Sequence, residues 1–152
     1  MKQLAFIFLI TMTAGSWAFA AESSTPVGSI KTVQSNASIL RNGVPIPAQT
    51  GAKIFNGDVL KTDHTGSIGV IFKDDALVSL GPNSQVNIDE FLFNPMEGRY
   101  SFLCRLIRGT AAFVSGQIAK LSPESMRVRT PVAEIGVRGT YFAVQAEGND
   151  GP

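Results

Sequence analysis

Four arginines in the second half of the chain carry its clearest binding chemistry: Arg99, Arg105, Arg127 and Arg129. Side chains alternate between the two faces of a strand, so Arg127 and Arg129 would share one face, and so would Arg99 and Arg105. Two such strands side by side would display all four together. A guanidinium binds carboxylate or phosphate in a bidentate manner, so this face would suit lipopolysaccharide phosphates, an acidic glycan or an acidic protein surface. A solvated face that discourages aggregation is the alternative interpretation.

Side chains suited to catalysis or metal binding are sparse. One Cys and one His exclude a disulfide framework and a Cys-rich zinc site, and make a Ser-His-Asp triad hard to build. Cys104 is predicted to be a buried thiol, with an intermolecular disulfide as the alternative, and His64 to be exposed in a polar turn. The pairs Asp74-Asp75 and Asp89-Glu90 match neither a paired-carboxylate cleft nor a calcium loop. We therefore expect a protein that is not an enzyme and holds no cofactor or metal.

The composition narrows the function classes further. The chain has 152 residues, of which 44% are apolar and 16% charged, and this suits one folded domain rather than a disordered segment. Thirteen basic against twelve acidic side chains remove the electrostatic argument for a nucleic-acid binder. Residues 22–97 carry five basic and eight acidic side chains, whereas residues 99–138 carry seven and two. The positive excess therefore lies in the segment that contains the four arginines.

The first 20 residues have the layout of a secretory signal peptide. Lys2 gives a positive start, an apolar run follows from Leu4 to Ala14, and Ala18-Phe19-Ala20 is a small-x-small cleavage site. We expect cleavage after residue 20, an all-β domain at residues 21–146 and a short tail at 147–152. The mature protein would be periplasmic or secreted and would have no transmembrane segment, since no other stretch is apolar enough.

Short runs rich in Val, Ile, Phe and Thr alternate with Gly- and Pro-containing turns, which predicts an all-β fold. The turn spacing favours many short antiparallel strands in a sandwich or a β-solenoid-like arrangement. Asn42-Gly43 is a strong hairpin signal, Asn56-Gly57 repeats it, and Asp89-Glu90 marks an expected bulge. Strands are predicted at residues 27–33, 37–41, 52–55, 58–62, 66–72, 76–80, 85–93, 99–107, 109–115, 126–130 and 140–146.

Four turn motifs then occur in the order and spacing of a known family. They are Gly57 to Thr62 with Gly66 to Phe72 after it, Leu80 to Ser84 with Val86 and Ile88 after it, Val128 to Ala133, and Gly136 to Val144. Over residues 27–146 the chain resembles the FecR domain. The resemblance implies a periplasmic or extracytoplasmic all-β module without catalytic activity. In the best-known members this module is the sensing half of an iron-uptake signalling regulator.

The chain differs from that regulator at its start. The regulator carries a cytoplasmic sigma-binding segment and a membrane helix ahead of the module, where this chain has the expected signal peptide. An exported module would not contact a cytoplasmic sigma factor. Relatives also usually carry further strands after the last motif, so we expect either a shortened domain or a partner that covers the edge of the final strand.

The motif residues are predicted to be structural, with a ligand role as the alternative. Glycine permits positive φ at turns, Asp58 and Asn83 can accept hydrogen bonds from nearby backbone N–H groups, and Pro131 fixes a bend between two strands. The positions with an expected structural role are Gly57, Asp58, Gly81, Pro82, Asn83, Pro131, Arg138, Gly139 and Thr140.

Two function classes are favoured after these exclusions, and an enzyme, which would need a cleft with two convergent carboxylates, is the weakest third. The first is an exported binding module that senses a cell-envelope protein or an acidic glycan through the arginines, with a role in signalling. The second is a structural or assembly subunit that pairs through the exposed edge of residues 140–146. Self-association is expected in that case, because an unpaired edge presents N–H and C=O groups to another chain.

Overall fold

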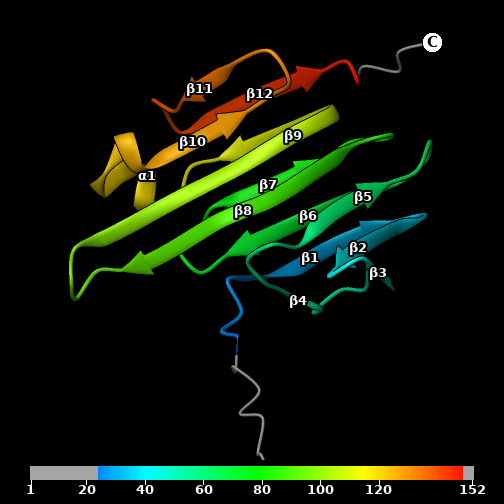
Figure 1. Ribbon diagram of the computed structural model, residues 1–152, viewed down its shortest axis with the longest axis horizontal. Coiled ribbons are helices and arrows are strands. Elements are labelled where there is room, and N and C mark those ends of the chain that lie inside the picture. The colour runs from blue at the N-terminus through cyan, green and yellow to red at the C-terminus, as the bar shows by residue number, and fades with distance from the viewer. Residues whose placement is uncertain (1–23, 149–152) are drawn as a thin grey trace, which may run out of the picture.

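The computed structural model describes residues 24–148, and the expected signal peptide lies outside this range. Strands make up more than half of the described chain and helical turns very little of it, which confirms the all-β prediction (Figure 1). Its strands are β1 (Gly28–Gln34), β2 (Ala37–Arg41), β3 (Val44–Pro47), β4 (Lys53–Ile54), β5 (Val59–Thr62), β6 (Ser67–Phe72), β7 (Leu77–Leu80), β8 (Gln85–Asn94), β9 (Arg99–Val114), β10 (Met126–Arg129), β11 (Glu134–Gly136) and β12 (Tyr141–Ala146). Two short helical turns, α1 (Gln117–Leu121) and η1 (Pro123–Ser125), join β9 to β10.

The sheet is an antiparallel meander that is folded over on itself. The segments β1–β2, β3–β4, β5–β6 and β7–β8 each run as one long strand with a single break, and β9 runs through without a break. On one side of the breaks the strand order is β4-β1-β6-β7-β9, and on the other it is β3-β2-β5-β8-β9. The four breaks and a bend in β9 form a line across the sheet, which we call the crease: residues 35–36, 48–52, 63–66 and 81–84, and the bend at 108–109.

Side-chain hydroxyls replace ladder hydrogen bonds at the crease. Thr62 Oγ1 donates to the carbonyl of Gly81 (2.7 Å) and accepts from the N–H of Ser84 (2.9 Å). Ser84 Oγ donates to the carbonyl of Thr110 (3.1 Å) and accepts from the N–H of the same residue (2.9 Å). In β9 the bend is made at Gly109, whose φ of +87° disfavours other residues and where a Cβ would overlap Ser84. These bonds satisfy buried backbone groups where the strands part.

Folding at the crease brings the two halves of the sheet face to face around one core. Phe72 of β6 lies on one half, and its ring centroid is 5.3 Å from that of Phe91 and 4.7 Å from that of Phe102 on the other. The predicted alternation is confirmed, since Ile68, Val70 and Phe72 are all buried. The architecture thus has the two facing layers of a sandwich, but both layers belong to one curled sheet.

The last strands line one edge of β9 (Figure 1). Strand β10 pairs in parallel with the first half of β9, β11 pairs with β10, and β12 pairs antiparallel with the second half of β9. The buried carboxylate of Asp74 holds α1 in place, because its Oδ1 accepts from the N–H of Ala76 (3.1 Å) and its Oδ2 from that of Ile118 (3.2 Å).

Several strand predictions need correction. Asn42-Gly43 does form a hairpin with φ of 51° and 79°, and the register shifts at Asp89 as expected. Asn56-Gly57 does not, because β4 pairs with β1 whereas β5 pairs with β2 and β8. The strands predicted at 99–107 and 109–115 are one continuous strand, since Gly109 bends the chain without ending its pairing. Strands β3 and β11 and the two helical turns were not among the predicted ranges.

Candidate functional site

The structure brings three of the four predicted arginines together on one face. Strand β10 lies beside β9, with Arg129 directly opposite Arg105 and Arg127 opposite Leu103. Arg99 lies instead at the β8–β9 hairpin, four residues before Leu103, which is about 13 Å along a strand. The expectation that all four would be displayed together therefore holds for three.

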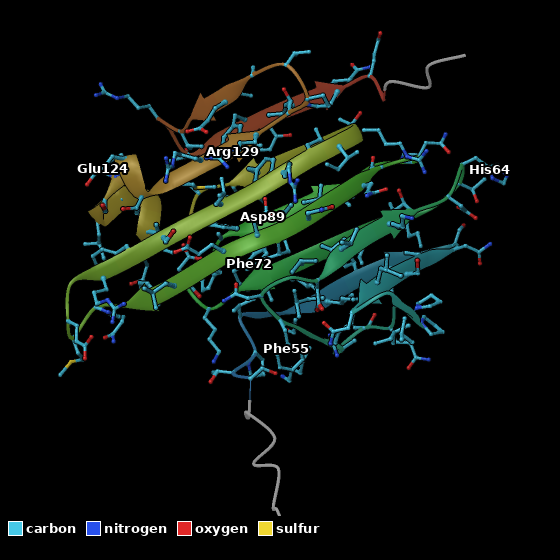
Figure 2. The ribbon with its side chains drawn as sticks, viewed as in Figure 1. Phe55, His64, Phe72, Asp89, Glu124 and Arg129 are labelled. Carbon is cyan, nitrogen blue, oxygen red and sulfur yellow. The ribbon has the colours of Figure 1, made fainter. Side chains whose placement is uncertain are left out.

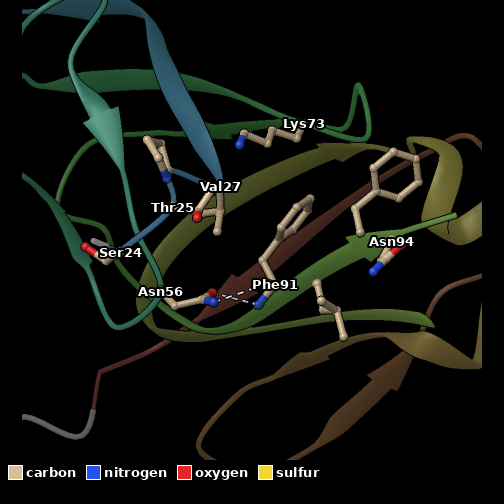
Figure 3. A pocket seen from close by; sticks show the side chains of 10 residues that line it. Ser24, Thr25, Val27, Asn56, Lys73, Phe91 and Asn94 are labelled. Carbon is tan, nitrogen blue, oxygen red and sulfur yellow. Dashed lines mark hydrogen bonds between the residues drawn. The ribbon is translucent and has the colours of Figure 1, made fainter. Parts of the chain in front are cut away.

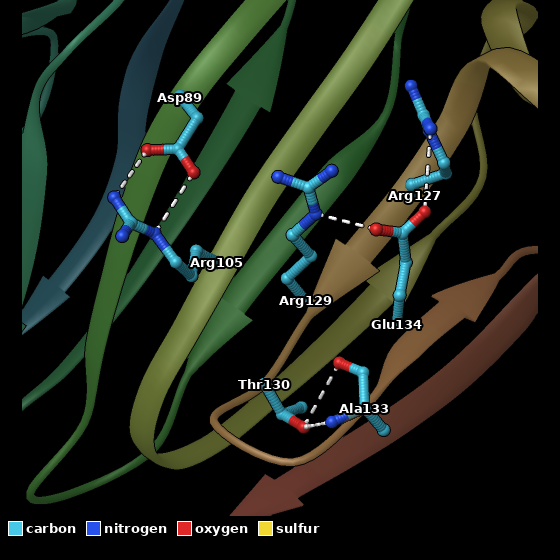
Figure 4. A network of polar contacts seen from close by, with 7 residues as sticks. All are labelled: Asp89, Arg105, Arg127, Arg129, Thr130, Ala133 and Glu134. Carbon is cyan, nitrogen blue, oxygen red and sulfur yellow. Dashed lines mark hydrogen bonds and ion pairs between the residues drawn. The ribbon is translucent and has the colours of Figure 1, made fainter.

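Each of these arginines is in contact with a carboxylate (Figure 4). Arg105 donates from Nε and Nη2 to Asp89 of β8, at 3.1 and 2.9 Å. Glu134 of β11 accepts from Arg129 Nε at 2.6 Å and from Arg127 Nη1 at 3.4 Å. We call this set of five side chains the arginine face. It is a mixed network rather than a bare basic patch.

The network is exposed and keeps a positive excess. The side chains of the three arginines are 45–46% exposed and that of Glu134 is 41% exposed, so water screens these pairs. Three guanidinium groups face two carboxylates, because Glu134 is shared. The hydrogen bond from Arg129, and the charges of Arg129 and Arg127, hold the pKa of Glu134 below its usual value. Figure 2 shows Asp89 and Arg129 on the same side of the sheet, far from His64.

A tight turn positions Glu134 opposite the arginines. Thr130 Oγ1 accepts from the N–H of Ala133 (3.1 Å), and the Thr130 N–H donates to the carbonyl of Ala133 (2.8 Å). Pro131 lies in this bend between β10 and β11, as predicted, and Glu134 then pairs with Arg129 across the ladder. Sequence reasoning missed Glu134, although a Pro-containing turn between Arg129 and an acidic residue is a signal for such a cross-strand pair.

Asp58 has a larger structural role than a turn acceptor. It is 1% exposed, accepts from the Phe55 N–H at 2.9 Å as expected, and also binds Arg41 through Nε (2.9 Å) and Nη2 (2.8 Å). The hydrogen bond to Asp58 raises the pKa of Arg41, whose guanidinium also lies 4.4 Å above the Phe55 ring. Sequence reasoning did not identify Arg41, because it lies 17 residues away.

The remaining motif residues lie in turns. Gly57 and Gly139 have φ of +87° and +113°, and Asn83 has φ of 51°, so these turns use left-handed or related backbone conformations. The loop before β12 is fixed by Ser115, which donates from Oγ to the Gly139 carbonyl at 2.7 Å and from its N–H to that of Thr140 at 2.8 Å. Of two further motif residues, Pro82 lies in the turn at the crease, and Arg138 lies in the exposed loop before β12.

The other residues considered for chemistry are not arranged for it. Cys104 is buried, and burial raises its pKa to about 12, which is characteristic of an inert core thiol. His64 is exposed and lines an open hollow at the crease with Lys61 and Arg108. Among residues 24–148, no group of three or more His, Cys, Asp or Glu side chains is arranged to hold a metal ion.

A hollow lies at the end of the sheet opposite the crease, and Figure 3 shows the side chains that line it. It measures about 470 Å³ and is lined by residues 24–27, Asn56, Lys73 and residues 91–94. The Asn56 side-chain amide pairs with the backbone of Phe91, donating to its carbonyl (3.1 Å) and accepting from its N–H (2.8 Å). The hydrogen bonds of the Asn56 amide thus hold the Phe91 backbone at the wall of this hollow.

Comparison with known proteins gives one match. Residues 58–151 match the family model described as FecR protein. No curated protein and no solved structure matches the chain. In the part of the chain that the structure describes, no helix has the length and apolar character needed to cross a bilayer.

Proposed function

The chain belongs to the FecR protein family, and on that premise we propose an exported, non-catalytic module that binds an acidic surface of the cell envelope. Membership suggests a signalling-related regulatory role, and the family is generally regulatory rather than catalytic. The layout of residues 1–20 supports export, and the arginine face supports the choice of an acidic partner.

The observation that carries the proposal is that the ion pairs of the arginine face are exposed to solvent. Exposed pairs contribute only about 0–1 kcal/mol each, so a ligand carboxylate or phosphate can replace Asp89 or Glu134 at little cost. Arg127 has the weakest ion pair of the three arginines, since its distance to Glu134 is 3.4 Å whereas that of Arg129 to Glu134 is 2.6 Å. A bidentate acidic group would bind between β9 and β10, where Arg105 and Arg129 are direct neighbours.

The first experiment reverses charge on the arginine face. Arg127→Glu combined with Arg129→Glu should abolish binding to purified lipopolysaccharide or to an acidic polysaccharide, measured by titration calorimetry. Arg99→Glu is the control for the two single variants Arg127→Glu and Arg129→Glu, because it reverses one charge on a 64%-exposed arginine outside the arginine face. Wild-type binding should also weaken as salt is raised, since screening acts over about 8 Å at physiological ionic strength. Equal binding by the double variant and the wild type would contradict the proposal.

The second experiment removes the internal competitor. Glu134→Gln keeps the shape of the side chain but frees Arg127 and Arg129 from their carboxylate. If the arginines bind the acidic probe, this variant should bind it more tightly than the wild type. Unchanged affinity would mean that Glu134 does not compete with the ligand for these arginines. Intact mass of the exported protein tests the other half of the proposal, because processing after residue 20 predicts a chain that begins at Ala21.

A further inference from the structure

Strand β12 differs from the other edges of the sheet in being long and unprotected. Strand β3 carries Pro45 and Pro47, which lack N–H groups, β4 has two residues and β11 has three. Strand β12 has six residues without Pro, Gly or charge, and it pairs with β9 through six consecutive positions without a bulge. Short strands, proline, charge and bulges are the features by which sheet edges resist pairing, and β12 has none of them.

The hydrogen-bonding direction of β9 shows which backbone groups of β12 face outward. Thr110 bonds towards β7 and β8, since its carbonyl accepts from Gly81 (3.0 Å) and its N–H donates to Ser84 Oγ (2.9 Å). Ser115 bonds in the opposite direction, to the carbonyl of Thr140 (2.8 Å). Direction alternates along an antiparallel strand, so the odd-numbered residues of β9 face β12.

The register then assigns each residue of β12. Three residues of β12 lie opposite odd-numbered residues of β9 and direct their N–H and C=O groups to β9: Phe142, Val144 and Ala146. The other three residues of β12 direct their N–H and C=O groups to the open edge: Tyr141, Ala143 and Gln145. The side chains of this second set are all exposed, and that of Tyr141 is 68% exposed. Among residues 24–148, no strand pairs with this edge.

We propose that β12 pairs antiparallel, across a twofold axis, with β12 of a second copy of this chain. A register centred on Val144 places Ala143 opposite Gln145 of the second copy, and both direct their N–H and C=O groups to the shared edge. On the core side, Phe142 lies opposite Ala146 of the second copy, so large faces small. No like charges meet along the six residues.

Charge at the strand ends favours an antiparallel pair. Arg138 precedes β12 and Glu147 follows it, and neither is in an ion pair among the residues that the structure describes. Antiparallel pairing brings the basic end of one strand near the acidic end of the other at both ends of the interface. Parallel pairing would place like charges together. The edge is therefore self-complementary, which suits the isologous contact of a twofold dimer.

The test is sedimentation velocity across a concentration series of the purified chain. The wild type should self-associate, and Ala143→Pro and Gln145→Pro should be monomeric, because each removes an edge N–H. Ala143→Ser is the matched control that keeps the N–H, and it should associate like the wild type. Circular dichroism checks that the variants fold. If a proline variant does not fold, Ala143→Lys takes its place, because a charged lysine on the edge strand opposes pairing by repulsion.

A charge exchange tests the orientation. Arg138→Glu and Glu147→Arg should each weaken association, and the two together should restore it. A wild type that stays monomeric throughout the series overturns the proposal, and so do folded proline variants that associate like the wild type. Failure of the double exchange to restore association overturns the antiparallel arrangement.

Discussion

Two Arg–Asp pairs in this protein share the same arginine–carboxylate geometry but differ in burial, so a comparison of the two tests what burial contributes. Arg41 binds Asp58 through Nε and Nη2, and Arg105 binds Asp89 through the same two nitrogens. The Asp58 side chain is 1% exposed and that of Asp89 is 26% exposed. We predict that Asp58→Ala destabilises the protein several times more than Asp89→Ala.

The magnitude follows from what each substitution leaves behind. Asp58→Ala removes three hydrogen bonds to a carboxylate and leaves the Phe55 N–H without an acceptor. Such losses cost about 1–3 kcal/mol for each group that water cannot reach. Arg41 is 31% exposed and regains part of its hydration, so we expect a loss of about 3 kcal/mol in total. Asp89→Ala should cost about 0.5 kcal/mol.

Urea unfolding measures both variants, with the slope m checked for constancy. The expected losses of stability correspond to a fall in Tm of about 10 °C for Asp58→Ala and of a few degrees at most for Asp89→Ala. Repeating Asp58→Ala in an Arg41→Ala background separates the contribution of the Arg41 pair from that of the Phe55 N–H. Equal losses for the two single variants would refute the argument from burial.

Three further predictions follow from buried or paired groups. Asp74→Ala should lower the free energy of unfolding, measured in urea, by about 2 kcal/mol, because it leaves two buried N–H groups without an acceptor. An unchanged midpoint would show that water replaces the carboxylate. Cys104 should react with a thiol reagent at pH 8 only after unfolding, because its pKa is raised to about 12, and rapid reaction of the native protein would contradict its burial. The pKa of Glu134 is lowered on folding, so its carboxylate stabilises the fold above its usual pKa of 4.5 and loses that effect as the pH falls through the lowered value. Arg129→Gln should move that pKa back towards 4.5, which an NMR titration of the Glu134 side chain would detect.

The sequence was most informative where structure depends on neighbouring residues. The alternation in β6, the Asn42-Gly43 hairpin and the bulge near Asp89 are all encoded within a few positions, and all three were predicted. The Asn56-Gly57 prediction was wrong although its local chemistry is the same as that of Asn42-Gly43. What differs is the pairing of the flanking strands, which depends on residues far along the chain.

The candidate site shows the same division. Alternation placed Arg105, Arg127 and Arg129 on strand faces, but the position of Arg99 depended on β10 starting beside Phe102 rather than earlier in β9. The carboxylate partners were not predicted for a similar reason. Asp89 is 16 residues from Arg105, and only the β8–β9 register brings the two together.

Strand β9 carries both proposed contacts, and Gly109 separates them. The arginine face lies beside its first half, and β12 pairs with its second half. A second copy on β12 would extend the second half of the sheet beyond its edge, whereas an acidic ligand would lie on the face of the first half, so the two need not compete. Mutational effects at separate, uncoupled sites usually add within about 0.5 kcal/mol. The two contacts should therefore be separable by mutation.

The expected result is a double dissociation between two variants. Arg127→Glu combined with Arg129→Glu should lose binding to the acidic probe and still self-associate, because neither residue lies on β12. Ala143→Pro should be monomeric and still bind the probe with wild-type affinity per chain. Sedimentation velocity and calorimetry on the same preparations measure both properties. If either variant loses both properties while it remains folded, the two contacts are coupled through β9, and the bend at Gly109 does not isolate one half of the sheet from the other.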